Sequence, residues 1–282
     1  MANNYGKNLR RKKDFFFICK DGDLKSLKFL MDVTKEIDID YINENNALFL
    51  ASEYNHLNLV KYLVGKKGIF LDVVCREKDN KTPLHIACEK GYKDIVNCLT
   101  SAGANVNVKD DHSLTPLFKT VIKRHSESVE ILRSLFVTFK ADFNILDKRS
   151  RTPLFWLIEN YDPREHDEFE NSHAREWNER KRTTWEMISL FIKLSHNQTY
   201  NINLNATNDV GDTPLIAVLK NKSHRGGKHG LIKLLIDSDA DLHVVDADQQ
   251  NALDLARKLD WDQTIIELLE SKHYSQSNHK TM

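Results

Sequence analysis

The chain has 282 residues, of which 40% are hydrophobic and 29% charged, and its 41 basic residues balance its 41 acidic ones. This is the composition of a soluble globular protein, and zero net charge argues against a general binder of nucleic acid or of membrane surfaces. No apolar run approaches the roughly 18 residues that a membrane-spanning helix needs, so we expect no membrane insertion.

The N-terminal region begins with a polar stretch, residues 1–13, that we expect to be flexible. Its basic run Arg10-Arg11-Lys12-Lys13 is either a solvated lead-in to the first helix or a patch for nuclear import or anionic lipid. The following segment, 14–31, contains FFFICKDGDLKSLKFLM and predicts two short helices separated at Asp21-Gly22. We expect residues 14–43 to form an N-terminal capping pair of helices, because arrays of stacked repeats need their ends covered.

The clearest pattern runs from Thr82 to Asn107 and reads TPLHIACEKGYKDIVNCLTSAGANVN. Thr82 can cap a helix, and Pro83 suits the first helical position. Gly91 ends this first helix. A second amphipathic helix follows, with an apolar stripe that starts at Ile95. The stretch therefore predicts a helix pair followed by a loop.

The same opening recurs along the chain, as the sign of a repeat. Equivalent openings stand at Asn46, Thr115, Thr152, Thr213 and Asn251, which gives successive spacings of 36, 33, 37, 61 and 38 positions. The TPLHxA opening and a period of about 33 residues resemble the ankyrin repeat. The resemblance implies an all-α ankyrin-repeat solenoid of stacked helix pairs with connecting hairpin loops. We expect one domain over residues 14–271, a C-terminal cap at 251–271 and a flexible tail at 272–282.

Three repeats depart from this pattern at the same place. The opening lies 13 positions before the apolar stripe of the second helix in the second repeat, but 16, 35 and 18 positions before it in the third, fourth and fifth. Thus 3, 22 and 5 positions are added between the first and second helices. Insertions that map to one edge of a repeat array often mark a binding face.

The large insertion, residues 161–182, is acidic at its front and basic at its back. Its later part could extend the second helix, so that Trp177 and Trp185 protrude. We interpret it as a solvated charged excursion with Trp177 as an aromatic anchor. An alternative is a zinc site made by His166, Glu170 and His173, which would share one face of a helix.

The fifth-repeat insertion, KSHRGGKHG, predicts a flexible surface loop; the alternative is contact with an acidic group. Arg225 and Lys228 in it could also contribute to binding of nucleic acid or lipid, for which steep salt dependence would be the sign. Cys88 and Cys98 are expected to point inward and to stay reduced. We therefore expect a cytoplasmic protein, with delivery into the cytosol or nucleus of a host cell as the alternative.

The ankyrin resemblance further implies a non-enzymatic module, without cofactor or metal, that binds another protein through its hairpin tips and first helices. His85 would join neighbouring loops by hydrogen bonds. The positions that match the family's contacts are Lys78, Asp79, Lys81, Glu89, Lys90, Asp111, His112, Leu114, Ile122, Lys123, Lys148, Arg149, Arg151, Glu159, Asn160, Asp209, Val210, Asp212, Lys220 and Asn221.

Within that set, Leu114 and Ile122 suggest an apolar contact beside a basic tip of Lys148, Arg149 and Arg151. We expect a monomer that acts as a scaffold, or as an effector aimed at host proteins, and consider nucleic acid an unlikely partner. An enzymatic or metal site on the insertion remains the alternative from another class.

Overall fold

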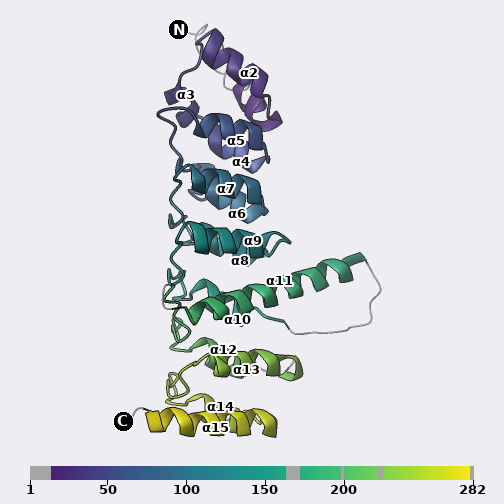
Figure 1. Ribbon diagram of the computed structural model, residues 1–282, viewed down its shortest axis with the longest axis vertical. Helices are drawn as coiled ribbons and strands as arrows, with labels where there is room; N and C mark the ends of the chain where they lie inside the picture. The colour runs from purple at the N-terminus through teal and green to yellow at the C-terminus, as the bar shows by residue number, and fades with distance from the viewer. Residues whose placement is uncertain (1–13, 163–171, 198–199, 222–224, 280–282) are drawn as a thin grey trace. The chain divides into compact units, whose positions relative to one another are not determined.

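The structure is a computed structural model that describes residues 14–162, 172–197, 200–221 and 225–279, with backbone alone at residues 137, 172–178, 225–226 and 275–279. Within these ranges it is helical and contains no strand. Its contacts divide the chain into two compact units, Met1–Ala141 and Asp142–Met282. We describe each unit by itself (Figure 1). The single domain over residues 14–271 remains a prediction.

The first unit consists of short helices joined by loops. After a helical segment at residues 14–21, its elements are α2 (Leu24–Lys28), the π-helix η1 (Phe29–Val33), α3 (Ile39–Glu44), α4 (Ala47–Glu53), α5 (Leu57–Val64), the 3-10 turn η2 (Arg76–Lys78), α6 (Pro83–Lys90), α7 (Lys93–Ser101), α8 (Pro116–Lys123), α9 (Ser128–Arg133) and the π-helix η3 (Ser134–Thr138).

The second unit repeats this scheme with two longer helices. Its elements are α10 (Pro153–Glu159), α11 (Ser172–Ser195), α12 (Pro214–Lys220), the 3-10 turn η4 (Arg225–Lys228), α13 (His229–Asp237), α14 (Ala252–Lys258) and α15 (Gln263–His279).

The first helix of each repeat begins where its capping residue predicts. The hydroxyls of Thr82, Thr115, Thr152 and Thr213 each accept the N–H of the residue three positions on, and proline follows each of them. Asn251 caps α14 in the same way. These bonds satisfy backbone donors that a helix start leaves open. Asn46 differs, since it lies in the left-handed region and makes no side-chain cap.

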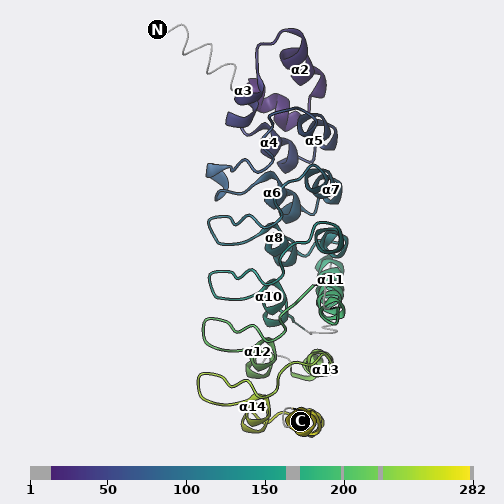
Figure 2. The same cartoon turned by 60° about the vertical axis from the view of Figure 1, so that its left-hand side comes forward.

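Within each unit, the first helices of neighbouring repeats pack on one another, and so do the second helices. In the first unit α4, α6 and α8 form one row and α5, α7 and α9 the other; in the second, α12 contacts α14 and α13 contacts α15. Figure 2 shows these two rows, with the hairpin loops beside the row of first helices. The leucine two residues after each threonine is buried, as at Leu84, Leu117, Leu154 and Leu215. Burial of this repeated apolar position supplies the main stabilising term.

The N-terminal region contains the predicted break between two short helices. Gly22 lies there with φ +71°, and a Cβ at that position would collide with the His56 ring. The His56 Nε2 atom lies 2.5 Å from the Lys20 carbonyl oxygen, which joins this helical end to the next repeat. The helix α3 was not predicted from the sequence.

The predicted tail differs from the structure, because α15 continues to His279. Residues 272–279 are therefore helical, whereas the sequence predicted a disordered tail from 272. Two contacts join the first residues of this extension to the preceding repeat. Lys272 forms an ion pair with Asp237 at 3.6 Å, and the rings of His273 and His243 lie 4.3 Å apart.

Candidate functional site

The hairpin tips are held by an Asp or Asn that stands five positions before the opening of the repeat. Asp110 accepts the backbone N–H groups of His112 and Leu114 at 2.9 and 3.0 Å. Asp147, Asn208 and Asp246 each accept the equivalent pair of N–H groups. Because Asp and Asn side chains favour such turns, this spacing is a signal in the sequence that the repeat analysis missed.

His85 joins one repeat to the next, as the resemblance implied. Its Nδ1 accepts the Thr82 backbone N–H at 3.1 Å, so its Nε2 donates to the Leu114 carbonyl in the following hairpin at 3.0 Å. The imidazole is fully buried, and burial lowers its pKa to about 4. A neutral ring with both nitrogens occupied is structural. Cys88 is also fully buried, and burial raises its pKa to about 12, so the pair offers no nucleophile.

In four of the repeats, the side chain of the residue before the opening contacts that of the residue seven positions after the opening. Lys81 forms an ion pair with Glu89 at 2.9 Å, and Lys220 forms one with Asp212 at 2.6 Å. Arg151 pairs with Glu159 at 2.5 Å, and the Lys258 amine donates to the Gln250 side chain at 2.7 Å.

Only the third repeat has apolar residues at these two positions, namely Leu114 and Ile122. Both side chains are half-buried.

In the first unit, most predicted contact residues on α6, α8 and their hairpins have partners within the chain. Lys78 pairs with Glu53 at 3.0 Å, and Glu89 lies 3.6 Å from Lys123 as well as next to Lys81. The Asp79 carbonyl accepts the N–H of Asp111, whose carboxylate accepts from Asn80. The exposed members of the predicted set in this unit are Lys78, Asp79, Lys90, Asp111, His112 and Lys123.

A buried ion pair beside this face was not predicted. Lys119 lies 2.5 Å from Asp110, and both side chains are almost entirely inaccessible. Burial alone would raise the pKa of Asp110, but hydrogen bonds from Lys119 and from the Leu114 N–H lower it. The carboxylate that holds the hairpin is therefore charged and fully engaged.

In the second unit, Arg151 of the predicted basic tip is held by carboxylates of its own chain. Arg151 makes two bonds to Asp147, at 2.7 and 2.9 Å, besides its pair with Glu159. Its side chain is only 13% exposed, because two carboxylates draw it onto the first helix. Lys148 and Arg149 are exposed, and Arg149 lies 3.7 Å from Asp209. The basic tip therefore comprises Lys148 and Arg149 alone.

The fifth-repeat insertion also differs from its prediction as a surface loop. Residues 225–228 form the turn η4, and Lys228 is 2% exposed, with its amine donating to the Asn221 carbonyl at 2.9 Å. Burial lowers the pKa of Lys228, and the neighbouring charge of Asp162 partly offsets that effect. Lys228 is thus unable to reach nucleic acid or lipid. The side chain of Arg225 and residues 222–224 lie outside the described structure.

The large insertion extends the second helix, as its sequence suggested. In Figure 1, α11 reaches beyond α12 and α13 on the side away from the hairpin loops. Trp185 does not protrude: it is half-buried, with its ring 5.9 Å from that of Tyr161. The Trp177 and His173 side chains, and the whole of His166 and Glu170, lie outside the described structure, so the predicted anchor and the zinc alternative stay untested. Elsewhere in the described chain, no group of three His, Cys, Asp or Glu residues could hold a metal.

The cysteines are free thiols in the described structure. Cys19, Cys75 and Cys88 are buried. Cys98, predicted to point inward, is only partly covered.

This chain thus consists of stacked helix pairs whose hairpins are fixed by buried polar groups, and it is a helical repeat protein. The family model of ankyrin repeats, in three copies, matches residues 15–110. The chain therefore contains ankyrin repeats and has the all-α ankyrin-repeat fold, as the sequence predicted. Ankyrin repeats are protein–protein interaction modules, and the fold is generally non-enzymatic.

Two solved structures show the same fold over most of the chain. The ankyrin repeat domain of Bcl-3 superposes with a TM-score of 0.67 at 21% identity, covering 91% of this chain and 97% of that one. The ankyrin repeat protein EF0377 gives a TM-score of 0.61 at 19% identity, covering 79% and 96%.

Curated relatives match over shorter regions. The palmitoyltransferase AKR1 of Lachancea kluyveri is 30% identical over 151 residues, which cover 50% of this chain and 19% of that protein. A putative ankyrin repeat protein of Fowlpox virus, FPV031, is 28% identical over 151 residues, covering 40% and 43%. The chain thus spans about a fifth of the transferase and less than half of the viral protein. None of the described helices is long and apolar enough to cross a membrane.

Proposed function

We propose that this protein binds a partner protein through the hairpin tips and first helices of its first unit, with Leu114 and Ile122 at the centre. The observation that supports this is the replacement, in the third repeat alone, of a paired polar position by two half-buried apolar residues. The partly exposed charged pair of Lys81 with Glu89 in the preceding repeat flanks them. An apolar centre with a polar rim is the usual composition of a protein interface.

The rim residues contribute to choice of partner more than to affinity. Lys90, Lys123, Asp111 and His112 are exposed around this centre. Exposed charges chiefly steer encounter and disfavour wrong partners, whereas a few central residues carry most of the binding free energy. Lys148 and Arg149 at a hairpin tip, and the α11 extension on the opposite edge, are two further candidate surfaces on the other unit. The setting we propose is the cytoplasm, with action in a host cell as an alternative supported by the similarity to a viral ankyrin protein.

The test is a substitution series read against a partner isolated by affinity capture and then purified. Ile122→Ser and Leu114→Ser should each weaken its binding by about tenfold or more, the effect expected of a hot spot. Val33→Ser is the matched control, since Val33 is an exposed apolar residue of the same unit on η1. Equal binding by all three variants would place the interface elsewhere, and loss with Trp177→Ala alone would place it on the α11 extension.

A further inference from the structure

The fourth repeat contains a second insertion, which follows α11. Ala240, which stands eleven positions before the next opening, follows the buried Leu235 of α13 by five positions. Ile202, which stands eleven positions before Thr213, follows the equivalent Phe191 of α11 by eleven. The spacing of this repeat, 61 positions, exceeds the usual period of about 33 residues by 28. The insertion at residues 161–182, which ends inside α11, accounts for 22 of these, which leaves six positions after the helix.

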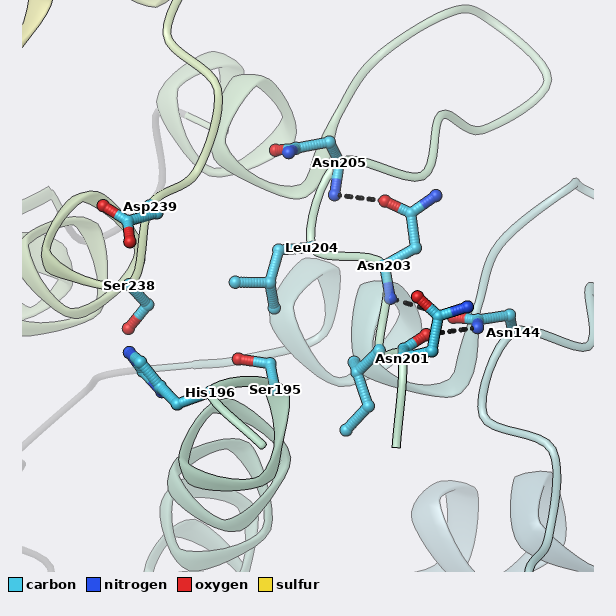
Figure 3. Close-up of a pocket in the computed structure, with 10 residues that line it drawn as sticks. Asn144, Ser195, His196, Asn201, Asn203, Leu204, Asn205, Ser238 and Asp239 are labelled. Carbon is cyan, nitrogen blue, oxygen red and sulfur yellow. Dashed lines mark hydrogen bonds between the residues drawn. The ribbon is translucent and has the colours of Figure 1, made fainter. Parts of the chain in front are cut away.

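Described residues on both sides of this second insertion, among them His196 and Asn201, border a hollow of about 490 Å³ within the second unit. Figure 3 shows its lining: Ser195 and His196 at the end of α11 and Ser238 and Asp239 at the end of α13 lie on one side, opposite Asn201 and Asn203. The volume is within the range of small-ligand sites, roughly 300–1,000 Å³.

The asparagine wall is fixed by its own hydrogen bonds. The Asn144 side chain donates to the Asn201 carbonyl at 2.7 Å and accepts the Asn203 N–H at 3.0 Å. The Asn203 side-chain oxygen accepts the N–H of Asn205 at 2.9 Å. Ile202 and Leu204 between them are less than a tenth exposed. The hollow thus has a rigid amide wall and an apolar strip, as a binding site needs.

The opposite wall presents hydrogen-bond acceptors and negative charge. The Ser195 hydroxyl donates to the Ile192 carbonyl and the Ser238 hydroxyl to the Leu234 carbonyl, both at 2.7 Å, so each oxygen retains lone pairs as acceptors. Asp239 adds a carboxylate, and the two helix ends add the partial negative charge of their carbonyls. No lysine or arginine is among the lining residues that the structure describes.

We propose that this hollow is a binding site for the guanidinium group of an arginine side chain from a partner protein. A guanidinium has five N–H donors in one plane and no acceptor, which suits acceptors on facing walls better than the point charge of an ammonium does. The apolar strip of Ile202 and Leu204 would cover the aliphatic part of the side chain. The site is separate from the proposed Leu114 and Ile122 surface and does not depend on it.

The test uses the full chain and the peptide N-acetyl-Gly-Arg-Gly-amide, followed by amide NMR. Saturable shifts should map to Asn203, Asn205 and Asp239. The citrulline peptide, which has the same shape without the charge, should bind at least fivefold more weakly, because a charge-assisted hydrogen bond is about twice as strong as a neutral one. Asp239→Asn should weaken the arginine peptide by a similar factor. Asn adopts the left-handed conformation of Asp239, φ +62°, as readily as Asp, so the backbone is retained.

Asp260→Asn is the matched control, since Asp260 has the same backbone conformation, φ +61°, outside the hollow. It should leave the affinity unchanged. Equal binding of the citrulline peptide, an unaltered affinity in Asp239→Asn, or shifts that map elsewhere would each overturn the proposal. Free L-arginine is the second arm. If it bound tenfold more tightly than the peptide, the guanidinium site would stand and its assignment to a protein partner would fall.

Discussion

Single residues in this chain are constrained mainly where one repeat meets the next. His125 Nε2 lies 2.8 Å from the carbonyl oxygen of Glu89, two residues before Gly91, just as His56 contacts the carbonyl of Lys20, two residues before Gly22. In both cases the histidine follows the glycine by 34 positions in the sequence. Each histidine thus lies against the end of a first helix in the preceding repeat, where glycine allows the close approach.

Replacement of Gly91 should show how much of this constraint is steric. Gly91 has φ +76°, and a Cβ there would lie 2.9 Å from His125 Cβ. We expect Gly91→Ala to lower the free energy of unfolding by about 1–3 kcal/mol, measured by urea denaturation. Gly103→Ala is the control for backbone strain, because Gly103 has φ +100° and nothing within 4 Å of its Cβ position. Equal losses in the two variants would show that the contact with His125 costs nothing.

His85 should make stability depend on pH in a defined window. Its pKa is about 4 in the folded chain because of burial, against 6.5 for an unperturbed histidine. Between these values the unfolded chain binds a proton that the folded chain does not, so stability falls as pH falls from 6.5 to 4. The loss should be about 2–3 kcal/mol and should be absent from His85→Gln, measured as the difference between the two urea-denaturation curves across that range. Parallel pH profiles would contradict it.

At the scale of elements, the sequence predicted helices well where capping residues and apolar periodicity agree. For α6, the local sequence Thr82, Pro83 and Leu84 is enough to predict where the helix begins. The sequence did not predict the six-residue helix α3, although Asp38 caps it by accepting the backbone N–H of Tyr41 at 2.8 Å. Nor could it show that Arg151 is drawn inward by Asp147, since that depends on the conformation of the hairpin. The six residues after α11 were present in the 61-residue spacing but were not recognised as a second insertion.

We expect the part of α11 around Trp185 to contribute to stability and the part before residue 180 to contribute little. Trp185 contacts Tyr161, and its indole lies 3.7 Å from the Cβ position of Gly230 on α13. Thr183 and Thr184 beside it are buried. We expect Trp185→Ala to lower the free energy of unfolding by about 1–3 kcal/mol. Replacing residues 163–180 by a short Gly-Ser turn should change the melting temperature by no more than about 2–4 °C. A larger fall would show that the replaced segment packs on the repeats.

At the scale of the whole molecule, repeat arrays are stabilised by each repeat and its neighbours rather than by distant contacts. The contacts of this chain form two compact units that meet at residues 141 and 142. The prediction of one continuous core, made from the regular openings, did not anticipate such a division. The opening residues of the repeats indicate where each helix pair begins, but they do not indicate how strongly one pair stabilises the next.

Two equivalent core substitutions should reveal that coupling. Leu84 in the first unit and Leu215 in the second occupy the same position of their repeats and are both almost inaccessible. Each change to alanine should cost about 2–5 kcal/mol through the lost apolar contact and the cavity that remains. Native-state hydrogen exchange should then show that Leu84→Ala lowers protection chiefly in α4, α6 and α8, and Leu215→Ala chiefly in α12 and α14, because locally unfolding regions coincide with contact-dense units. If either substitution lowered protection equally in all five helices, the chain would unfold as one cooperative array, and the continuous core predicted from the sequence would be the better description.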